Sequence, residues 1–177
     1  MVRIATIEDV PQILEIYAPY IETSTATFEY DVPCLRSFTQ RFLTITEKFP
    51  WLVWEEDGRI LGYAYASAPY ERAAFSWCAE PSVYLRPEAR GRGIGKALYA
   101  RLEQILKEQG YQVLYALITD ENVSSIRFHE SCGYVQKVHF PDCGFKFGRW
   151  LGLVWMEKRL IPVTIPNKLP ICFVDIK

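Results

Sequence analysis

Three glycines alternate with larger residues in one short segment of this 177-residue chain: Gly91, Gly93 and Gly95. Glycine adopts positive φ at little steric cost, so the backbone here can bend until successive N–H groups converge on one point. A helical pattern follows directly, and the positive end of its dipole lies at the same point. Cationic side chains accompany the glycines, at Arg90, Arg92 and Lys96. The segment 86–96 is therefore predicted to bind a pyrophosphate.

Two other phosphate-binding turns fit this segment less well. A nucleotide-hydrolysing P-loop needs Ser or Thr directly after Gly-Lys to hold magnesium, whereas Ala97 follows Lys96. A dinucleotide-binding turn needs G-x-G-x-x-G in a parallel βαβ unit. The spacing here is G-x-G-x-G, and an antiparallel hairpin pattern precedes it, although Asp120 lies at a suitable distance for a ribose. The plain alternative is a solvated glycine-rich connection.

The composition describes a single domain without a polyanion-binding surface. Half of the residues are apolar, which suffices for one core. The 20 basic and 21 acidic side chains nearly cancel, so we expect no nucleic acid partner and no membrane surface. No segment resembles a signal peptide or a membrane span, and we expect a soluble, cytoplasmic protein. The five scattered cysteines lack a C-x-x-C pair, so we expect neither disulfides nor a metal site.

Helical and strand periodicities alternate along the chain, which predicts a mixed α/β fold. Strands are expected over 2–5, 51–54, 60–66, 75–85 and 113–118, with two more before residue 159. Helices are expected over 6–21, 38–49, 95–109 and 122–132. Asp57-Gly58 predicts a hairpin turn, and Pro81 predicts a bulge or splay within its strand because it lacks an N–H. Residues 161–177 carry three prolines and are expected to be a surface-packed or partly ordered tail outside the domain 1–160.

The glycine segment, Arg90-Gly91-Arg92-Gly93-Ile94-Gly95, resembles the acyl-CoA pyrophosphate loop of the GNAT N-acetyltransferase superfamily. A later segment, running from Asn122 through Ser125 to Gly133-Tyr134, is similar to the superfamily motif that lines the pantetheine arm. Within the superfamily the chain is similar to the phosphinothricin and methionine-sulfoximine N-acetyltransferases. That likeness is carried by residues 23–29, 77–85 and 144–150, and it extends over about residues 2–160. Gly152 departs from it, since the family often has an acidic residue there.

The resemblance implies a GNAT fold, in which a central mixed, mostly antiparallel sheet is flanked by helices. It implies acetyl-CoA as the acyl donor, a small amino-acid-like acceptor, no metal and a homodimer. It assigns coenzyme binding to one strand edge, the glycine loop and the later helix, at Val83, Tyr84, Leu85, Arg90, Gly91, Arg92, Gly93, Ile94, Gly95, Lys96, Asn122, Ser125 and Ser131.

Acetyl transfer to an amine requires a base, because a free amino group is mostly protonated near neutral pH. Glu80 precedes Pro81 in an otherwise apolar strand, where partial burial would raise its pKa towards the working range of a base. The resemblance places the catalytic base on this same glutamate. The alternative is a carboxylate paired with an arginine such as Arg72, without a chemical role.

Two further groups are candidates for the remaining steps. A free N–H within residues 83–85 is expected to stabilise the oxyanion. His129 stands where much of the superfamily has a tyrosine that protonates the leaving thiolate, and imidazole can do the same. A single histidine on a helix is equally consistent with a structural role.

The acceptor pocket is expected from two segments, 23–29 and 70–75, and its predicted wall residues are Phe28, Glu29, Arg72, Ala73, Ala74 and Phe75. Arg72 can bind a substrate carboxylate, and the two aromatic rings can enclose an aliphatic side chain. Core packing of the rings is the alternative. Two other functions stay open: an acyl-CoA-binding regulatory module, and a protein or peptide N-acetyltransferase.

Overall fold

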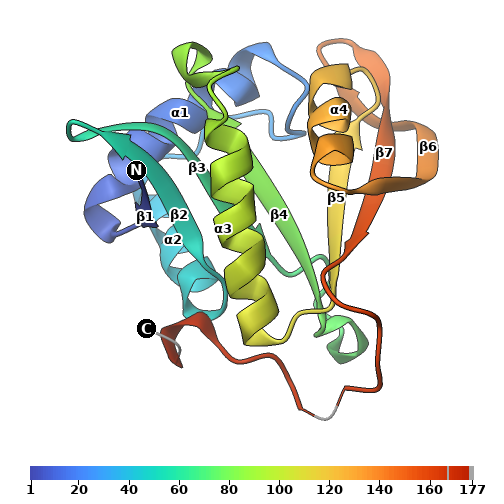
Figure 1. The fold of residues 1–177 in the computed structure, drawn as a ribbon. Coiled ribbons are helices and arrows are strands. Elements are labelled where there is room, and N and C mark those ends of the chain that lie inside the picture. Colours follow the sequence, from blue (N-terminus) through green and yellow to red (C-terminus); the bar gives the residue numbers. More distant parts are fainter. Residues whose placement is uncertain (167, 176–177) are drawn as a thin grey trace.

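The computed structural model describes residues 1–166 and 168–175, so residues 167, 176 and 177 of the expected tail lie outside it. One seven-stranded sheet has the order β1-β2-β3-β4-β5-β7-β6 (Figure 1). Its strands are β1 Val2–Ile4, β2 Trp51–Glu56, β3 Arg59–Ser67, β4 Cys78–Leu85, β5 Val113–Thr119, β6 Val135–Lys146 and β7 Arg149–Arg159. Every neighbouring pair is antiparallel except β4 and β5. The predicted mixed, mostly antiparallel sheet is confirmed.

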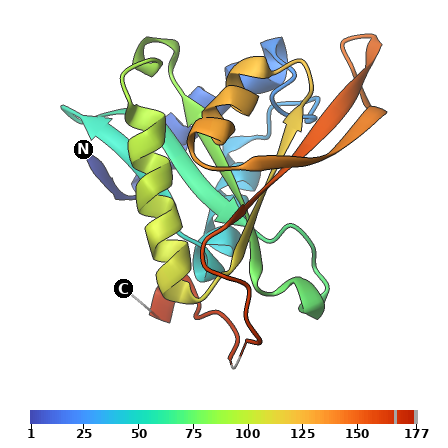
Figure 2. The ribbon, with the colours of Figure 1, turned by 45° about the vertical axis from the view of Figure 1, so that its right-hand side comes forward.

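Helices cover both faces of the sheet (Figures 1 and 2). They are α1 Val10–Thr23, α2 Leu35–Lys48, α3 Ile94–Gln109 and α4 Val123–Ser131. Residues from α3, such as Leu98 and Leu102, form one core with β3, β4, β5 and β7. Residues from α1 and α2, such as Ile13 and Phe38, form a second core on the opposite face. The sheet therefore separates two apolar layers.

Local turn chemistry places the main boundaries where the sequence predicts them. Asp57 and Gly58 have φ of 50° and 77°, the positive values that a tight hairpin between β2 and β3 requires. Gly110 ends α3 with φ of 101°, and its N–H donates to the carbonyls of Leu106 and Lys107. These two predictions are confirmed.

The predicted start of the fourth strand at Phe75 is wrong. Ala73–Phe75 form a short 3₁₀ turn, and β4 begins only at Cys78. The N–H of Phe75 donates to Arg72 and the N–H of Ser76 donates to Ala73, which closes the turn. The apolar character of the segment could not reveal these local bonds.

β4 and β5 diverge after two residue pairs, Cys78 with Val113 and Ala79 with Leu114. On its other edge β4 stays paired with β3 from Glu80 to Leu85. The divergence begins beside Pro81, and the predicted splay is thereby confirmed. A gap lined by backbone thus opens in the middle of the sheet.

The described part of the tail crosses the sheet end remote from the glycine loop (Figure 1). The side-chain amide of Gln109 donates to the carbonyl of Ile171 at 2.7 Å, and the N–H of Ile171 donates to the carbonyl of Gln109 at 2.8 Å. Phe173 is buried in the same core as α3. The described tail is therefore attached to the domain around Ile171 and Phe173, whereas residues 162–166, 168 and 169 are exposed.

Candidate active site

The splay between β4 and β5 opens into a cavity of about 590 Å³. Its walls come from β4, β5, the glycine loop, α3, α4, the end of α1 and the loop after it. Predicted site residues that line it are Glu80, Val83, Tyr84, Leu85, Arg90, Gly91, Gly95, Asn122, Ser125 and His129. Segments far apart in the sequence therefore meet at one site.

The glycine loop has the backbone shape that the sequence predicts. Gly91 and Gly93 have φ of 73° and 80°, and a methyl group on either would meet no atom within 4 Å among the described residues. Gly93 caps α3, since its carbonyl accepts the N–H of Ala97. The loop is thus an open concave turn at a helix N-terminus, which fits an anionic group.

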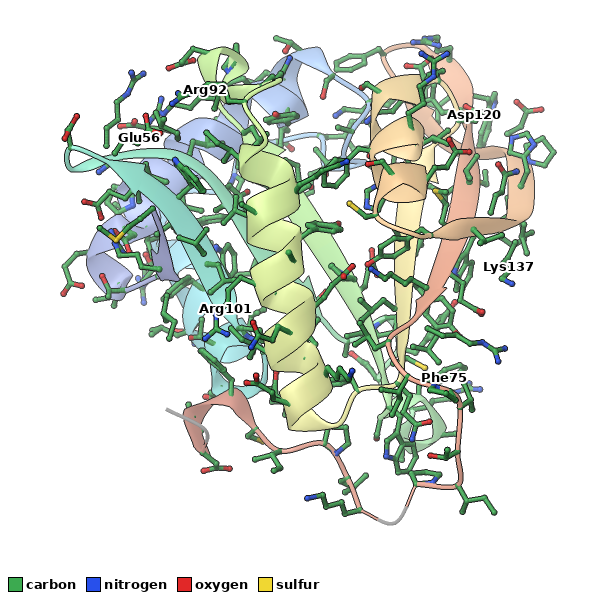
Figure 3. All side chains as sticks on the ribbon, viewed as in Figure 1. Glu56, Phe75, Arg92, Arg101, Asp120 and Lys137 are labelled. Atoms are coloured by element: carbon green, nitrogen blue, oxygen red, sulfur yellow. The ribbon has the colours of Figure 1, made fainter. Side chains whose placement is uncertain are left out.

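The three cations of the loop have different surroundings. Arg90 lines the cavity, and its Nη2 donates to the hydroxyl of Tyr20 at 3.1 Å. Arg92 points to the hairpin of β2 and β3, where it forms an ion pair with Glu56 at 2.8 Å (Figure 3). Lys96 is exposed, and it is absent from the cavity wall as described. Arg90 is therefore the loop cation best placed for a ligand in the splay.

The free edge of β4 is partly occupied by Tyr20 of α1. The Tyr20 hydroxyl donates to the carbonyl of Leu85 at 2.6 Å and accepts its N–H at 3.2 Å. The predicted free N–H within residues 83–85 is therefore not that of Leu85. Val83 lies beyond the last pair between β4 and β5, so its edge facing β5 has no strand partner within the described sheet.

Glu80 is half-buried at the point where the two strands separate. Burial raises the pKa of its carboxyl group from 4.5 to about 7. Neither Glu80 nor Arg72 forms an ion pair within the described residues, so the alternative of a Glu80–Arg72 pair does not occur. The predicted burial and pKa shift are confirmed, and a carboxyl group of this pKa can both take and release a proton near neutral pH.

His129 of α4 also lines the cavity and is 4% exposed. Its Nδ1 is 2.8 Å from the carbonyl oxygen of Ser125, and its Nε2 is 2.9 Å from the hydroxyl of Tyr99. Burial lowers the pKa of the imidazole. Both ring nitrogens are engaged, so neither presents a free N–H to the cavity.

Three of the other residues predicted to contact the coenzyme lie on α4 or at its N-cap, and a fourth lies under the glycine loop. Asn122 caps the helix by accepting the N–H of Ser125 at 3.2 Å, which explains why the helix begins at Val123. Ser131 lies at the far end of α4, where its hydroxyl donates to the carbonyl of Phe128. Ile94 is buried in the core beneath the loop. Of these residues, Asn122 and Ser125 reach the cavity wall.

The six predicted acceptor residues are absent from the cavity wall as described. Phe28 packs on Gly144 of β6, whose missing side chain makes room for the ring: a methyl group there would lie 2.4 Å from it. Glu29 forms an ion pair with Arg41 at 2.7 Å and accepts the Tyr17 hydroxyl at 3.0 Å. The loop before α2 is therefore fixed by contacts that sequence reasoning did not identify.

Arg72, Ala73, Ala74 and Phe75 belong to the 3₁₀ turn before β4. Phe75 faces a second, mostly apolar hollow of about 370 Å³ together with Tyr70, Val138 and Trp155. Figure 3 shows Phe75 at the end of the molecule opposite Arg92. Arg72 is exposed. The two predicted acceptor walls are thus not brought together at one described cavity.

Lys146 anchors the loop that does line the cavity. It is 1% exposed, and its Nζ donates to the carbonyls of Ser24 and Thr27 at 2.9 and 2.8 Å. Ser24 and Thr25 line the cavity, and the Thr25 hydroxyl donates to Glu121 at 2.7 Å. A buried lysine between two carbonyls holds this loop against the hairpin of β6 and β7.

Ser24, Thr25 and Ala26, from the segment 23–29 that was expected to form an acceptor wall, line the cavity. Sequence reasoning did not identify Tyr20, Tyr99 or Glu121 as wall residues. The signal for Tyr99 was present, since a tyrosine at a core-facing helix position needs a partner for its hydroxyl. Among the described residues no cluster of three or more His, Cys, Asp or Glu side chains could hold a metal. Nor does the described chain contain a helix with the length and apolar character needed to cross a membrane.

A model of the GNAT acetyltransferase domain matches residues 2–155 of the chain. Phosphinothricin N-acetyltransferase of Alcaligenes faecalis is 37% identical over 161 residues, which cover 90% of this chain and 82% of that one. L-methionine sulfoximine/L-methionine sulfone acetyltransferase of Pseudomonas aeruginosa is 35% identical, covering 91% and 95% of the two chains.

A solved structure shows the same fold with the acyl donor bound. The GNAT superfamily phosphinothricin acetyltransferase of Sinorhizobium meliloti, in complex with acetyl-CoA, superposes with a TM-score of 0.90 at 36% identity. The superposition covers 96% of this chain and 94% of that one.

Proposed function

Because the chain belongs to the GNAT acetyltransferase family and is an acetyl-CoA-dependent N-acetyltransferase, we propose that it acetylates the primary amine of a small amino-acid-like acceptor. The acceptors named for its relatives, phosphinothricin, methionine sulfoximine and methionine sulfone, are the first candidates. The observation that carries the chemistry is the half-buried Glu80, with a pKa of about 7, in the splay of the sheet.

Acetyl-CoA is assigned to the cavity between the β4 edge and the two helix N-termini. The open glycine turn and Arg90 would hold its diphosphate, and the backbone of Val83 would hold the pantetheine as an added strand would. Asn122 and Ser125 line the same cavity on the α4 side. These residues supply binding and orientation, with the thioester carbonyl brought towards Glu80.

Glu80 then acts as the general base. Its carboxylate, directly or through one water, takes the proton from the amine as nitrogen attacks the thioester carbonyl. A pKa near 7 keeps a large fraction ionised at neutral pH while leaving the group basic enough to accept the proton. Arg72, expected from the sequence to bind the acceptor carboxylate, is exposed and lies outside the described wall of the Glu80 cavity, so it is assigned no part in this step.

A homodimer is the assembly that the family resemblance implies. The apolar hollow around Tyr70, Phe75 and Trp155 supports it, because such a surface is stabilised when covered. Sedimentation equilibrium of the full chain tests this assembly, and a monomer at micromolar concentration would contradict it.

A kinetic screen tests the proposed acceptor. Coenzyme thiol release from acetyl-CoA is measured with phosphinothricin, methionine sulfoximine, methionine sulfone, free amino acids and a peptide with a free N-terminus. Saturation with the first group and little turnover of the peptide is expected. Peptide turnover alone would favour a protein N-acetyltransferase, and coenzyme binding without any turnover would favour a regulatory module.

A further inference from the structure

The hydroxyl of Tyr99 bridges a backbone carbonyl and the imidazole of His129. Its oxygen lies 3.1 Å from the carbonyl oxygen of Pro81 and 2.9 Å from Nε2 of His129. The second ring nitrogen, Nδ1, lies 2.8 Å from the carbonyl oxygen of Ser125. Tyr99, His129 and Pro81 all line the cavity. One chain of contacts therefore runs from β4 through α3 to α4.

The two carbonyls determine where the protons of this chain lie. A carbonyl oxygen only accepts, so Nδ1 donates to Ser125 and the Tyr99 hydroxyl can donate to Pro81. While His129 is neutral with its proton on Nδ1, Nε2 can only accept, so the single hydroxyl proton of Tyr99 is shared between Nε2 and the carbonyl of Pro81. Once Nε2 is protonated, it donates to the Tyr99 oxygen and the hydroxyl proton is free to be given elsewhere. The Tyr99–His129 pair can therefore hold one additional proton, on Nε2, beyond those it carries when both side chains are neutral.

The environment suits a proton that is held briefly and released. Burial lowers the pKa of His129, so a proton at Nε2 is readily given up. Burial raises the pKa of Tyr99 well above its usual value, so the hydroxyl returns to its protonated form after each transfer. The Tyr99 hydroxyl contacts the carbonyl of Pro81, the residue that directly follows Glu80 in the chain.

We propose that Tyr99, rather than His129, protonates the departing thiolate, and that His129 is the positioning residue behind it. The proposal rests on the acetyl-transfer site assigned above. As the C–S bond breaks with its electron pair on sulfur, the Tyr99 proton moves to sulfur and the Nε2 proton moves to the Tyr99 oxygen. The products are a free thiol, a neutral tyrosine and a neutral imidazole protonated at Nδ1. The proton that Glu80 removes from the amine replaces the spent one through water.

Other titratable groups around the pair come from each packed element: Glu80, Tyr65, Glu103, Cys132, Tyr134 and Lys158. Glu103 and Lys158 form an ion pair with each other at 2.5 Å. Tyr134 packs edge-on against the imidazole, with ring centroids 5.1 Å apart. Within the described residues its hydroxyl makes no hydrogen bond of normal geometry, and the side chain that acts on it is Glu103, not His129. Tyr134 is therefore a matched control for Tyr99.

Tyr99→Phe is compared with Tyr134→Phe in the full chain. Tyr99→Phe is expected to lower kcat by about 10²-fold with the KM for acetyl-CoA unchanged, whereas Tyr134→Phe leaves kcat within about threefold. An NMR titration of His129 without substrates gives a second readout. Tyr99→Phe lowers the pKa of the imidazole, because Nε2–H loses its acceptor, and Tyr134→Phe does not. Equal kcat values, or equal His129 pKa values, in the two variants would overturn the proposal.

The NMR measurement is independent of the acceptor, so a wild-type chain that acetylates none of the tested amines leaves it interpretable. If Tyr99→Phe fails to fold, the tautomer of His129 in the wild-type chain provides the test. The neutral imidazole of the wild-type chain is expected as the Nδ1–H tautomer, with Nε2 unprotonated. The opposite tautomer would place the proton of the pair on Nε2 at rest and would refute the relay.

Discussion

A methyl group on Gly152 would lie 2.1 Å from Oδ2 of Asp120, so the Asp120 carboxylate occupies the space that any side chain at residue 152 would need. Oδ2 lies 3.0 Å from Nε2 of His139, and the Asp120 N–H donates to the carbonyl of Gly152 at 3.1 Å. Asp120 follows β5 beside α4 (Figure 3). The N-acetyltransferases that this chain resembles often have an acidic residue at position 152. Here the carboxylate of Asp120, at the end of β5, occupies the corresponding space.

Gly152→Ala is expected to displace Asp120 from His139 and to lower the free energy of unfolding by about 1–2 kcal/mol, as overpacking does. In an Asp120→Ala background the same change should cost less, because the carboxylate has gone and only Nε2 of His139, 2.8 Å from the added methyl group, still has to move. Thermal or denaturant unfolding of the four chains gives the coupling energy directly. Additive effects of the two substitutions would show that the contact carries no energy.

Glu80→Gln is expected to lower turnover by about 10²- to 10⁴-fold while acetyl-CoA still binds. In the wild-type chain kcat/KM should rise with pH through about 7, as the Glu80 carboxyl group ionises. The variant should lose this limb of the profile. Glu130→Gln, at an exposed position of α4, is the control and should leave both unchanged. Near-normal turnover of Glu80→Gln would exclude a base at this position.

Glu80→Gln should also stabilise the folded state at alkaline pH. The folded pKa of Glu80, about 7, is raised above the value of 4.5 for the unfolded chain. Burial of the neutral Glu80 carboxyl group therefore leaves the free energy of unfolding at its full value below about pH 4.5. That free energy decreases as the pH rises towards 7, because the unfolded chain ionises first. At pH 8 the buried charge costs on the order of 1–3 kcal/mol, which Gln lacks. Unfolding at pH 8 and pH 5 measures this, and an equal effect at both pH values would contradict it.

Sequence patterns predicted those parts of the fold that short-range chemistry decides. Asp57-Gly58, Gly110 and the glycines before α3 each need backbone angles that few residues adopt, so their roles follow from residue type alone. The splay at Pro81 follows from its missing N–H. These features position the cavity, which is why its location could be inferred from the sequence.

The missed features depend on contacts between distant segments. Tyr99 meets His129 across 30 positions of sequence, and Lys146 meets Ser24 across 122. Local periodicity marks such residues as core without identifying their partners. The predicted acceptor walls failed to meet at one cavity for the same reason, since Phe28 and Phe75 each found other partners.

Gly91→Ala is expected to weaken acetyl-CoA binding by about tenfold or more. The residue lines the cavity with φ of 73°, a conformation that costs alanine roughly 1 kcal/mol or more. Gly148→Ala is the matched control, because Gly148 has φ of 74° and equally open surroundings but lies in the turn between β6 and β7. Isothermal titration with coenzyme A should separate the two variants. Equal losses of affinity would assign the effect to general strain.

Lys146→Met is expected to loosen the loop from Ser24 to Thr27, because it leaves two buried carbonyls without their donor at about 1–3 kcal/mol each. The loop lines the cavity at Ser24 and Thr25, and Thr25 is bonded to Glu121. If this side of the cavity receives the acceptor, the KM for the amine should rise about tenfold while the KM for acetyl-CoA changes little. Lys107→Met, at an exposed position of α3, tests whether loss of a lysine charge alone has this effect. Steady-state kinetics with each substrate varied in turn provide the measurement. A rise in the KM for acetyl-CoA alone would mean that Lys146 supports the coenzyme side of the cavity instead.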